Sequence, residues 1–393
     1  MDKPVIVAGI GMTPFVSPSR AGNYLELGAR AIREALADAG LDYSAVEQVY
    51  AGYVYGDSTS GQAVAYQVGM TGVPVVNVNN NCSTGSTALF LARQAVASGA
   101  VECALAVGFE QMAPGALTEH WNDRPTPLKR FLDAADVIQA PSDAPLALRL
   151  FGGAGEEYKQ RYGAGDALFA SVAVKARRHA EHNERAIFRE PLTVAEVGAS
   201  PHLFGVLTRL QCCPPSCGGA AAIVCSEQFA RRHGLDTAVR IRAQAMTTDG
   251  PGTFEAGSMM TLVGYDMSRA AADRVYAAAG VAPEELDAVE LHDCFTANEV
   301  LTYEALRLTP EGTAEQFVAD GDNTYGGRVV TNPSGGLLAK GHPLGATGLA
   351  QCFELVTQLR GRAGPRQVDG ARLALAHNIG LGGACLVTLY EAA

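Results

Sequence analysis

Runs of apolar residues along the chain alternate with segments whose apolar positions recur every three or four residues. The run Val5–Ile10 predicts a strand, and Tyr24–Ala39 predicts an amphipathic helix that Gly40 ends. Further strands are predicted at Val46–Tyr53 and at Cys103–Gly108. Strands that alternate with helices indicate crossover connections. We therefore expect an α/β fold with a largely parallel sheet that is covered on both faces.

A cysteine lies where one of these strands passes into a helix. Pro74–Val78 predicts a buried strand, and the apolar spacing from Ala88 to Ala95 predicts a helix that Gly99 ends. Cys82 therefore precedes a helix N-terminus, where unpaired N–H groups and the helix dipole favour a thiolate. We expect its pKa to fall from about 8.5 into a reactive range. The alternative is a buried thiol that acts as a small hydrophobic residue.

The chain also shows internal similarity. Ala39-Gly-Leu-Asp resembles Ala279-Gly-Val-Ala, and Gly218-Gly-Ala-Ala resembles Gly382-Gly-Ala-Cys at a shorter interval. The two matches indicate two similar halves, the first of which carries additional residues. That additional material is expected between about 114 and 214, where Pro, Arg and His become common, and an insertion of this size often forms a lid or binding surface.

A histidine in the second half is the expected partner of Cys82. His342 lies in a glycine-rich loop before a predicted helix, at an interval from Cys82 close to that of the first repeat. If a pseudo-twofold relates the halves, the two helix N-termini can meet at the centre. His342 has a suitable pKa for a base that activates a thiol. A histidine that only caps its helix is the alternative.

Two further segments carry candidate chemistry. His292 and Cys294 follow a predicted strand, where active-site groups of open α/β sheets gather, although a core thiol beside a hydrogen-bonded histidine is also possible. The glycine-rich turn at 377–383 follows another strand. Its N–H groups could bind an oxyanion, and a plain turn is the alternative.

Composition narrows the classes of function. Charged residues make up 18% of the chain and hydrophobic residues 48%, a globular balance, and no apolar run is long enough to span a membrane. The net charge of −11 argues against nonspecific nucleic-acid binding. The 9 cysteines, an odd number, fit a reducing compartment. With no signal peptide or peroxisomal address in the sequence, we expect a soluble cytoplasmic protein.

Other signals are weaker. The basic segment 175–179 could bind phosphate groups of a ligand, although a solvated helix face is the favoured interpretation. Cys212, Cys213 and Cys217 have no fourth ligand at a suitable spacing, so we expect no metal site. Nothing resembles a nucleotide-binding glycine loop, so no redox cofactor is expected.

Four motifs resemble those of the thiolase superfamily, in particular the thiolase module of sterol carrier protein X. They are Asn81-Cys-Ser-Thr-Gly-Ser, His292-Asp-Cys-Phe, Asn332-Pro-Ser-Gly-Gly-Leu-Leu-Ala-Lys-Gly-His-Pro-Leu-Gly-Ala-Thr-Gly and His377-Asn-Ile-Gly-Leu-Gly-Gly. The resemblance covers almost the whole chain. It implies a thiolase fold, with duplicated βαβαβαββ halves in a five-layer αβαβα arrangement and an inserted loop domain. The expected division is 1–113 with 215–245 for the first half, 114–214 for the insertion and 246–393 for the second half.

The resemblance also implies roles for individual residues. Cys82 would be the nucleophile that becomes acylated, and His342 would activate it. His292 and His342 would bind the thioester oxygen where the enolate develops, and the N–H groups of Cys82 and Gly380 would form a second oxyanion hole. Many thiolases place a second catalytic cysteine where this chain has Asn378. The sterol-carrier type instead uses the cysteine of His-Asp-Cys-Phe, so Cys294 would be the acid and base.

The function implied is a 3-oxoacyl-CoA thiolase in fatty-acyl, branched-chain or sterol side-chain degradation. Coenzyme A would be a substrate and no cofactor would be needed, and the family suggests a homodimer without nucleic-acid or membrane partners. The alternatives are a biosynthetic acetyl-CoA C-acetyltransferase, a thiolase-like aldolase with an OB-fold partner, and a noncatalytic lipid-transfer protein. The presence of both Cys82 and Cys294 argues against the aldolase.

Overall fold

A computed structural model describes residues 3–113, 121 and 123–393. Its strands form one ten-stranded sheet and a separate two-stranded hairpin. Among the described residues, no helix is both long and apolar enough to cross a membrane. The strands are β1 (Val5–Met12), β2 (Gln48–Gly52), β3 (Val75–Val78), β4 (Cys103–Glu110), β5 (His202–Phe204), β6 (Leu207–Thr208), β7 (Gly218–Ser226), β8 (Val239–Thr247), β9 (Ala288–Glu290), β10 (Val330–Thr331), β11 (Leu373–Gly380) and β12 (Ala384–Ala392).

The large sheet consists of two five-stranded halves with the same strand order. The first half reads β1-β7-β4-β2-β3 and the second reads β8-β12-β11-β9-β10, so each strand has a counterpart of the same direction and place. The halves join at β1 and β8, where only Val5 with Ile241 and Ile6 with Arg240 pair. This arrangement confirms the duplication that the sequence indicated.

The expectation of a largely parallel sheet is wrong, because both halves are mixed. In the first half β2 is parallel to both of its neighbours, β3 and β4, and in the second half β9 is parallel to β10 and β11. The strand that comes last along the chain in each half, β7 or β12, runs antiparallel to both of its neighbours within the half. The strand β12 follows β11 through a short turn, which forces the chain to reverse direction.

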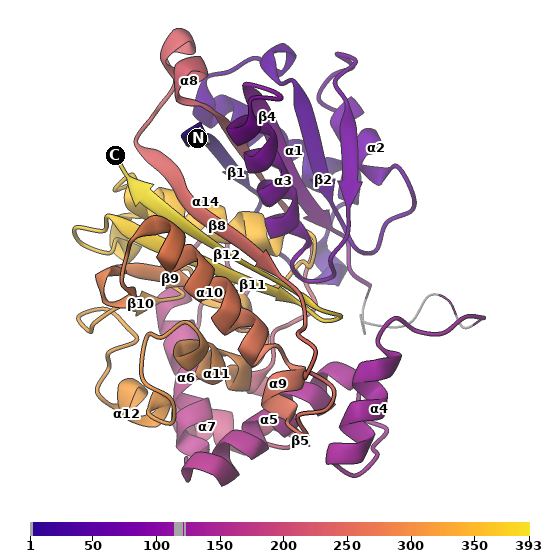
Figure 1. Cartoon of the computed structure of the whole chain (residues 1–393), viewed down its shortest axis with the longest axis vertical. Coiled ribbons are helices and arrows are strands. Elements are labelled where there is room, and N and C mark those ends of the chain that lie inside the picture. Colours follow the sequence, from indigo (N-terminus) through magenta and orange to yellow (C-terminus); the bar gives the residue numbers. More distant parts are fainter. Residues whose placement is uncertain (1–2, 114–120, 122) are drawn as a thin grey trace.

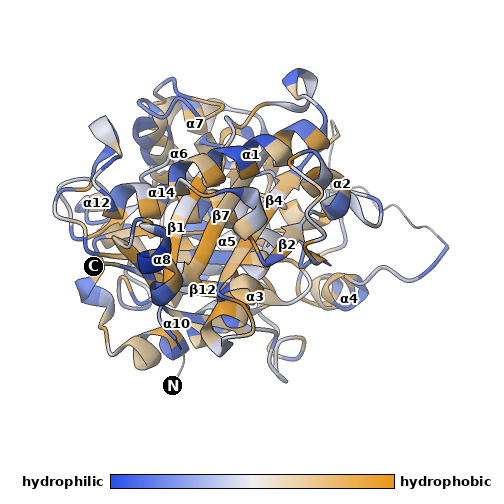
Figure 2. Ribbon diagram, turned by 90° about the horizontal axis from the view of Figure 1, so that it is seen from above, coloured by the Kyte–Doolittle hydropathy of each residue, from blue (hydrophilic) through white to orange (hydrophobic). Residues whose placement is uncertain are grey.

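The helices form three layers around the two halves of the sheet. Two buried helices, α3 (Thr84–Ser98) and α14 (Thr347–Leu359), pack against each other between them, while α1 (Tyr24–Ala39) and α10 (Tyr265–Ala279) cover the outer faces. Gly40 and Gly280 end these outer helices in the left-handed conformation, as the repeat predicts. Figure 2 shows strands β1 and β7 in hydrophobic colours and the outer helices α1 and α8 (Glu227–His233) with hydrophilic stretches. The remaining helices of the two halves are α2 (Ser60–Tyr66), α9 (Met259–Leu262), α11 (Thr296–Ala305), α12 (Ala314–Ala319) and α13 (Gly336–Ala339).

Between β4 and β7 the chain leaves the sheet and forms a helical region beside the second half (Figure 1). It contains α4 (Lys129–Ile138), α5 (Leu146–Tyr162), α6 (Asp166–Ala180), α7 (Val194–Ala199) and the β5–β6 hairpin. Helices α5 and α6 pack against α11, and α6 also packs against α13. The predicted start of the insertion at 114 lies outside the described residues, and the exact domain limits stay a prediction.

The strand predicted at Pro74–Val78 was expected to be buried, and this is wrong. It forms β3 at the edge of the sheet, where it pairs only with β2 and leaves Val76 40% exposed. An edge strand has one neighbour instead of two, so apolar composition alone does not distinguish it from a central strand.

The basic segment 175–179 is not a uniformly solvated face, contrary to expectation. Lys175 and His179 are buried. The ammonium group of Lys175 contacts the carboxylate of Glu299 and donates to Thr331 Oγ1 at 2.6 Å. The ring nitrogens of His179 lie 3.0 Å from the Asn332 carbonyl oxygen and 2.7 Å from Thr324 Oγ1. These two side chains therefore connect α6 to the second half of the fold.

Lys175→Met is expected to lower the free energy of unfolding by about 3–5 kcal/mol, because it leaves the Glu299 carboxylate buried without its partner. Adding Glu299→Leu should recover most of that loss, since no unpaired charge then remains. Urea unfolding of the three proteins measures both effects. As a control, Lys129→Met breaks an exposed ion pair with Asp133 and should cost less than about 1 kcal/mol. Equal losses for the two lysine variants would contradict this account.

Candidate active site

Cys82 is held in a tight turn between β3 and α3. Asn81, directly before it, has a φ of 52°, in the left-handed region. The turn is closed by Thr84, whose hydroxyl donates to the Asn81 carbonyl oxygen at 2.6 Å and accepts from the Asn80 N–H at 2.9 Å. The polar residues after the strand thus form a fixed loop that presents the sulfur at the start of α3.

His342 approaches from the second half, in the loop between α13 and α14. Its backbone N–H donates to Ser216 Oγ at 2.9 Å, and its Nδ1 lies 2.6 Å from Thr347 Oγ1. The Thr347 hydroxyl donates to the Pro343 carbonyl oxygen at 3.0 Å, so it accepts from Nδ1–H. The Nε2 atom then carries a lone pair, and it is buried with no hydrogen-bond partner.

His292 lies in the loop after β9, and its hydrogen bonds select the opposite tautomer from that of His342. The amide nitrogen Nδ2 of Asn378 lies 2.8 Å from His292 Nδ1. An amide nitrogen can only donate, so Nδ1 accepts and the ring proton resides on Nε2. The backbone of His292 is also fixed, because its N–H donates to His377 Nδ1 at 3.4 Å and its carbonyl oxygen accepts from Asn298.

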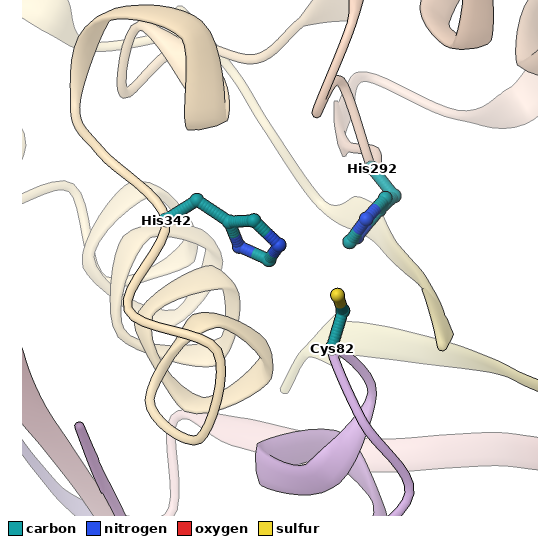
Figure 3. Close-up of side chains that lie close together, drawn as sticks. All are labelled: Cys82, His292 and His342. Atoms are coloured by element: carbon teal, nitrogen blue, oxygen red, sulfur yellow. The ribbon is translucent and has the colours of Figure 1, made fainter. Parts of the chain in front are cut away.

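The structure brings three of the predicted residues into contact range. One atom each from Cys82, His292 and His342 lies within 4.8 Å of the others (Figure 3). The two imidazole rings are 4.9 Å apart between centroids and nearly perpendicular, at 85°. Cys294 lines the same pocket. Residues from both halves, far apart in sequence, therefore share one site.

The expectation of a lowered pKa for Cys82 is wrong. Burial, then the nearby Glu110 carboxylate, raise the pKa of this thiol to about 12, although backbone N–H groups of Cys82 and Leu381 act in the opposite direction. Glu110 itself accepts hydrogen bonds from the N–H groups of Val54, Tyr55 and Gly345 at 2.9–3.1 Å. Burial nevertheless raises the pKa of its carboxyl group to about 7. The helix N-terminus is therefore not sufficient to ionise the buried thiol, which needs a base.

Both histidines of the site are neutral. Burial, with a contribution from Lys340, lowers the pKa of His342 to about 3. Burial, followed by the neighbouring His342 and His377, lowers the pKa of His292 well below its usual value. A neutral imidazole has one N–H and one lone pair. His342 consequently presents a base to the pocket, whereas His292 presents a hydrogen-bond donor.

Apart from these groups and Asn81, the lining of the pocket is apolar, and its volume is about 110 Å³. Cys213 lines it, and its backbone N–H donates to the Cys294 carbonyl oxygen at 2.9 Å. Phe151 of α5 stacks on Phe295 at 5.0 Å between ring centroids. The other apolar lining residues are Met112, Ala147, Pro214, Pro215, Leu344, Ile379 and Leu381. Apolar surroundings of this kind strengthen the electrostatic interactions inside the pocket.

Gly380, the predicted oxyanion-hole residue, lies between two residues that line the pocket, Ile379 and Leu381. A Cβ atom at this position would lie 2.1 Å from the Asn80 carbonyl oxygen, so the backbone needs glycine there. Besides the N–H of Cys82 itself, the N–H of Leu381 contacts the Cys82 sulfur; Leu381 follows the predicted Gly380 in the glycine-rich turn at 377–383. Glu110 and Asn378 were missed as contributors to the site. Only their hydrogen bonds to residues far along the chain reveal them.

The donor set does not favour a metal ion. Within the described part of the chain, Cys82, His292 and His342 are the group whose atoms lie close enough for one. A metal needs a lone pair from each imidazole, but the structure places the proton of His292 on Nε2. Cys212, Cys213 and Cys217 do not gather into a ligand group in the described residues.

The sequence matches known protein families and relatives. Residues 5–198 match the family described as thiolase, N-terminal domain, and residues 253–389 match thiolase C-terminal domain-like. Sterol carrier protein 2 of Oryctolagus cuniculus is 53% identical over 391 residues, which are 98% of this chain and 72% of that protein.

Solved structures agree with this relationship. The Ltp2-ChsH2(DUF35) aldolase superposes with a TM-score of 0.83 at 26% identity, and the match covers 100% of this chain and 98% of the aldolase chain. Human mitochondrial 3-ketoacyl-CoA thiolase superposes with a TM-score of 0.75 at 18% identity, covering 100% and 99%, and shows the shared fold. With both family matches and the close sterol carrier protein 2 relative, the chain belongs to the thiolase superfamily, and within it to the sterol carrier protein X type.

Proposed function

We propose that this chain is a 3-oxoacyl-CoA thiolase, which cleaves the C2–C3 bond of its substrate and transfers the shortened acyl group to CoA through Cys82. One observation carries the proposal. A buried thiol lies beside one imidazole with a free lone pair and another with a free N–H, in an apolar pocket with a second thiol. These are a nucleophile, a base, an oxyanion donor and a proton source.

The first step is activation of Cys82 by His342. Nε2 of His342 takes the thiol proton as the sulfur attacks the 3-keto carbon. Because both groups begin neutral, the proton transfer creates an imidazolium and transfers negative charge to the substrate, and the two charges stay close together. After the transfer His342 has an N–H on both ring nitrogens and can donate into the pocket.

The second step breaks the carbon–carbon bond. The C2–C3 electron pair moves into the thioester and forms an enolate, whose oxygen the N–H groups of His292 and protonated His342 bind. Burial, with the nearby Cys213, Cys82 and Asp293, raises the pKa of the Cys294 thiol well above its usual value. Cys294 therefore holds a proton at neutral pH and gives it to C2, which releases acetyl- or propanoyl-CoA while the shortened acyl chain stays on Cys82.

The third step returns the enzyme to its starting state. The Cys294 thiolate takes the proton of an incoming CoA thiol, and the CoA sulfur attacks the acyl group on Cys82. The carbonyl oxygen of that thioester would accept from backbone N–H groups at Cys82 and at the 380–381 turn. Cys82 leaves as a thiolate and recovers its proton from His342. CoA is thus a substrate, and the cycle uses no cofactor.

A wider cavity of about 570 Å³ shares Asn81, Ala147 and Leu381 with the reaction pocket. It is the proposed path for the thioester arm of the substrate, since it adjoins the reaction pocket at these three residues. A human thiolase with related fold has been solved in complex with CoA, which supports CoA as the second substrate.

We also propose a homodimer that covers the edge strand β3, because Tyr66, Met70 and Val76 are exposed there.

Other functions fit single observations. The 26% identical aldolase structure favours carbon–carbon cleavage of a hydroxyacyl-CoA, a reaction that would not need a cysteine nucleophile. An acetyl-CoA C-acetyltransferase would run the same chemistry toward condensation. The name sterol carrier protein 2 of the relative allows a noncatalytic lipid-transfer role. The two thiols of the pocket favour the thiolase.

CoA-dependent cleavage of straight, 2-methyl and sterol-side-chain 3-oxoacyl-CoAs tests the proposal. We expect thiolysis with at least one class and no detectable turnover for Cys82→Ala, because no other group can hold the acyl chain at that position. Cys212→Ala is the matched control, since Cys212 precedes the pocket residue Cys213 in the sequence but does not itself line the pocket. Cleavage that survives Cys82→Ala, or that needs a hydroxyacyl-CoA, would exclude the thiolase mechanism.

Cys294→Ala is expected to lower kcat for thiolysis by about 10²–10⁴-fold, the usual contribution of a positioned acid or base. The exchange of C2 hydrogens of acetyl-CoA with D₂O, followed by mass spectrometry, should fall with it, because Cys294 carries that proton. A variant that keeps thiolysis and exchange within about tenfold of wild type would assign the proton transfer to another group.

The resting state of Cys82 is expected to be a thiol between about pH 5 and 9, because its raised pKa means that the proton is kept as the pH rises. The difference in ultraviolet thiolate absorbance between wild type and Cys82→Ala should be negligible over this range. Lowering the pH from about 7 to 5 should not protonate His342, whose pKa is depressed to about 3. A thiolate signal at neutral pH that disappears in Cys82→Ala would show an ion pair instead.

A further inference from the structure

We propose that Asn378 is a positioning residue that holds His292 in the tautomer with its proton on Nε2, and that Ser86 holds the far end of the Asn378 side chain in place. The proposal rests on the thiolase function above and extends it to two residues outside the four chemical groups of the site. It explains how neighbouring neutral histidines can have opposite roles.

The direction of the hydrogen bond carries the argument. Asn378 Nδ2 lies 2.8 Å from His292 Nδ1, and the amide nitrogen has no lone pair available to accept. Nδ1 must therefore accept, which leaves Nε2 as the protonated nitrogen of the neutral ring. An Asn378 amide turned by 180° would place an oxygen there and select the other tautomer, with a lone pair toward the substrate oxygen.

Ser86 contacts the other end of the amide. Its hydroxyl donates to Asn378 Oδ1 at 2.9 Å, and both side chains are buried. Ser86 lies in the first turn of α3, the helix that Cys82 precedes. The space around the pair is closed, because a Cβ atom at Gly348 would lie 2.1 Å from Ser86 Oγ and 2.8 Å from Asn378 Oδ1. The helix that Cys82 precedes thus also contacts the residue that positions the oxyanion donor in the other half.

The contrast with His342 shows why such control is needed. Thr347 accepts from Nδ1–H of His342 and leaves its Nε2 as a base, whereas Asn378 donates to Nδ1 of His292 and leaves its Nε2 as a donor. The rings are 4.9 Å apart in the same apolar pocket. Without these different partners, two imidazoles of similar burial would have no reason to differ.

The test uses Asn378→Asp, which keeps the size of the side chain but replaces the donor with an acceptor. The carboxylate would accept from Nδ1–H and remove the proton from Nε2 of His292. We expect kcat for thiolysis to fall by about 10²–10³-fold with little change in KM, as for loss of an oxyanion donor. Asn323→Asp is the matched control, a buried asparagine outside the pocket, and should leave kcat within about threefold of wild type.

A double-mutant cycle separates the tautomer from a merely structural effect. An asparagine at position 292 has no tautomers, so Asn378→Asp should cost at least about tenfold less in a His292→Asn background than in wild type. Equal losses in the two backgrounds would show that the carboxylate acts through charge or folding, and would overturn the proposal.

The nitrogen NMR spectrum of protein with ¹⁵N-labelled histidine gives a readout that does not depend on turnover, with His292→Asn used to assign the signals. Wild type should show a protonated Nε2 and an unprotonated Nδ1 for His292, and Asn378→Asp the reverse. A wild-type His292 protonated on Nδ1 would overturn the inference, even if no variant folds. Wild-type protein with the expected spectrum but without thiolysis would instead overturn the proposed function.

Discussion

The close approach of backbone between the two halves is the constraint on which the site depends. The loop that carries His342 packs on the first half through Gly345, where a Cβ atom would lie 2.5 Å from the Phe109 carbonyl oxygen. Gly85 at the start of α3 and Gly108 on β4 face the Gly345 carbonyl oxygen in the same way, at 2.7 and 2.1 Å from their own hypothetical Cβ atoms. Side chains at these positions would separate the helix N-termini. Glycine at three positions in two halves therefore brings Cys82 and His342 together.

Burial then decides the chemistry of the groups that meet there. The N–H of Gly345, which this packing removes from solvent, is satisfied by the buried Glu110 carboxyl group. The same burial keeps Cys82 protonated and both histidines neutral. The thiol and the two imidazoles therefore become charged only when a substrate is present, and the hydrogen-bond partners of each imidazole decide which one is the base.

Much of the fold follows from patterns in the sequence. The apolar periodicity indicated strands and helices such as Tyr24–Ala39, and the internal repeat indicated that Cys82 and His342 would begin equivalent helices. The properties that the sequence did not predict depend on tertiary neighbours. The pKa of Cys82 is one, because a helix N-terminus lowers it and burial raises it by more. The burial of Lys175 is another, because its partner Glu299 lies on a helix far along the sequence. The function of Asn378 depends on which way its amide faces, and no residue pattern encodes that.

In the proposed reaction the acyl group rests on Cys82. Incubating the protein with a 3-oxoacyl-CoA, removing CoA, and digesting it for peptide mass spectrometry tests this claim most directly. The account predicts a thioester of the shortened acyl chain on the peptide that contains Cys82, which disappears when CoA is added back. An acyl group on Cys294 or Cys213, or product formation with no acylated peptide, would contradict it.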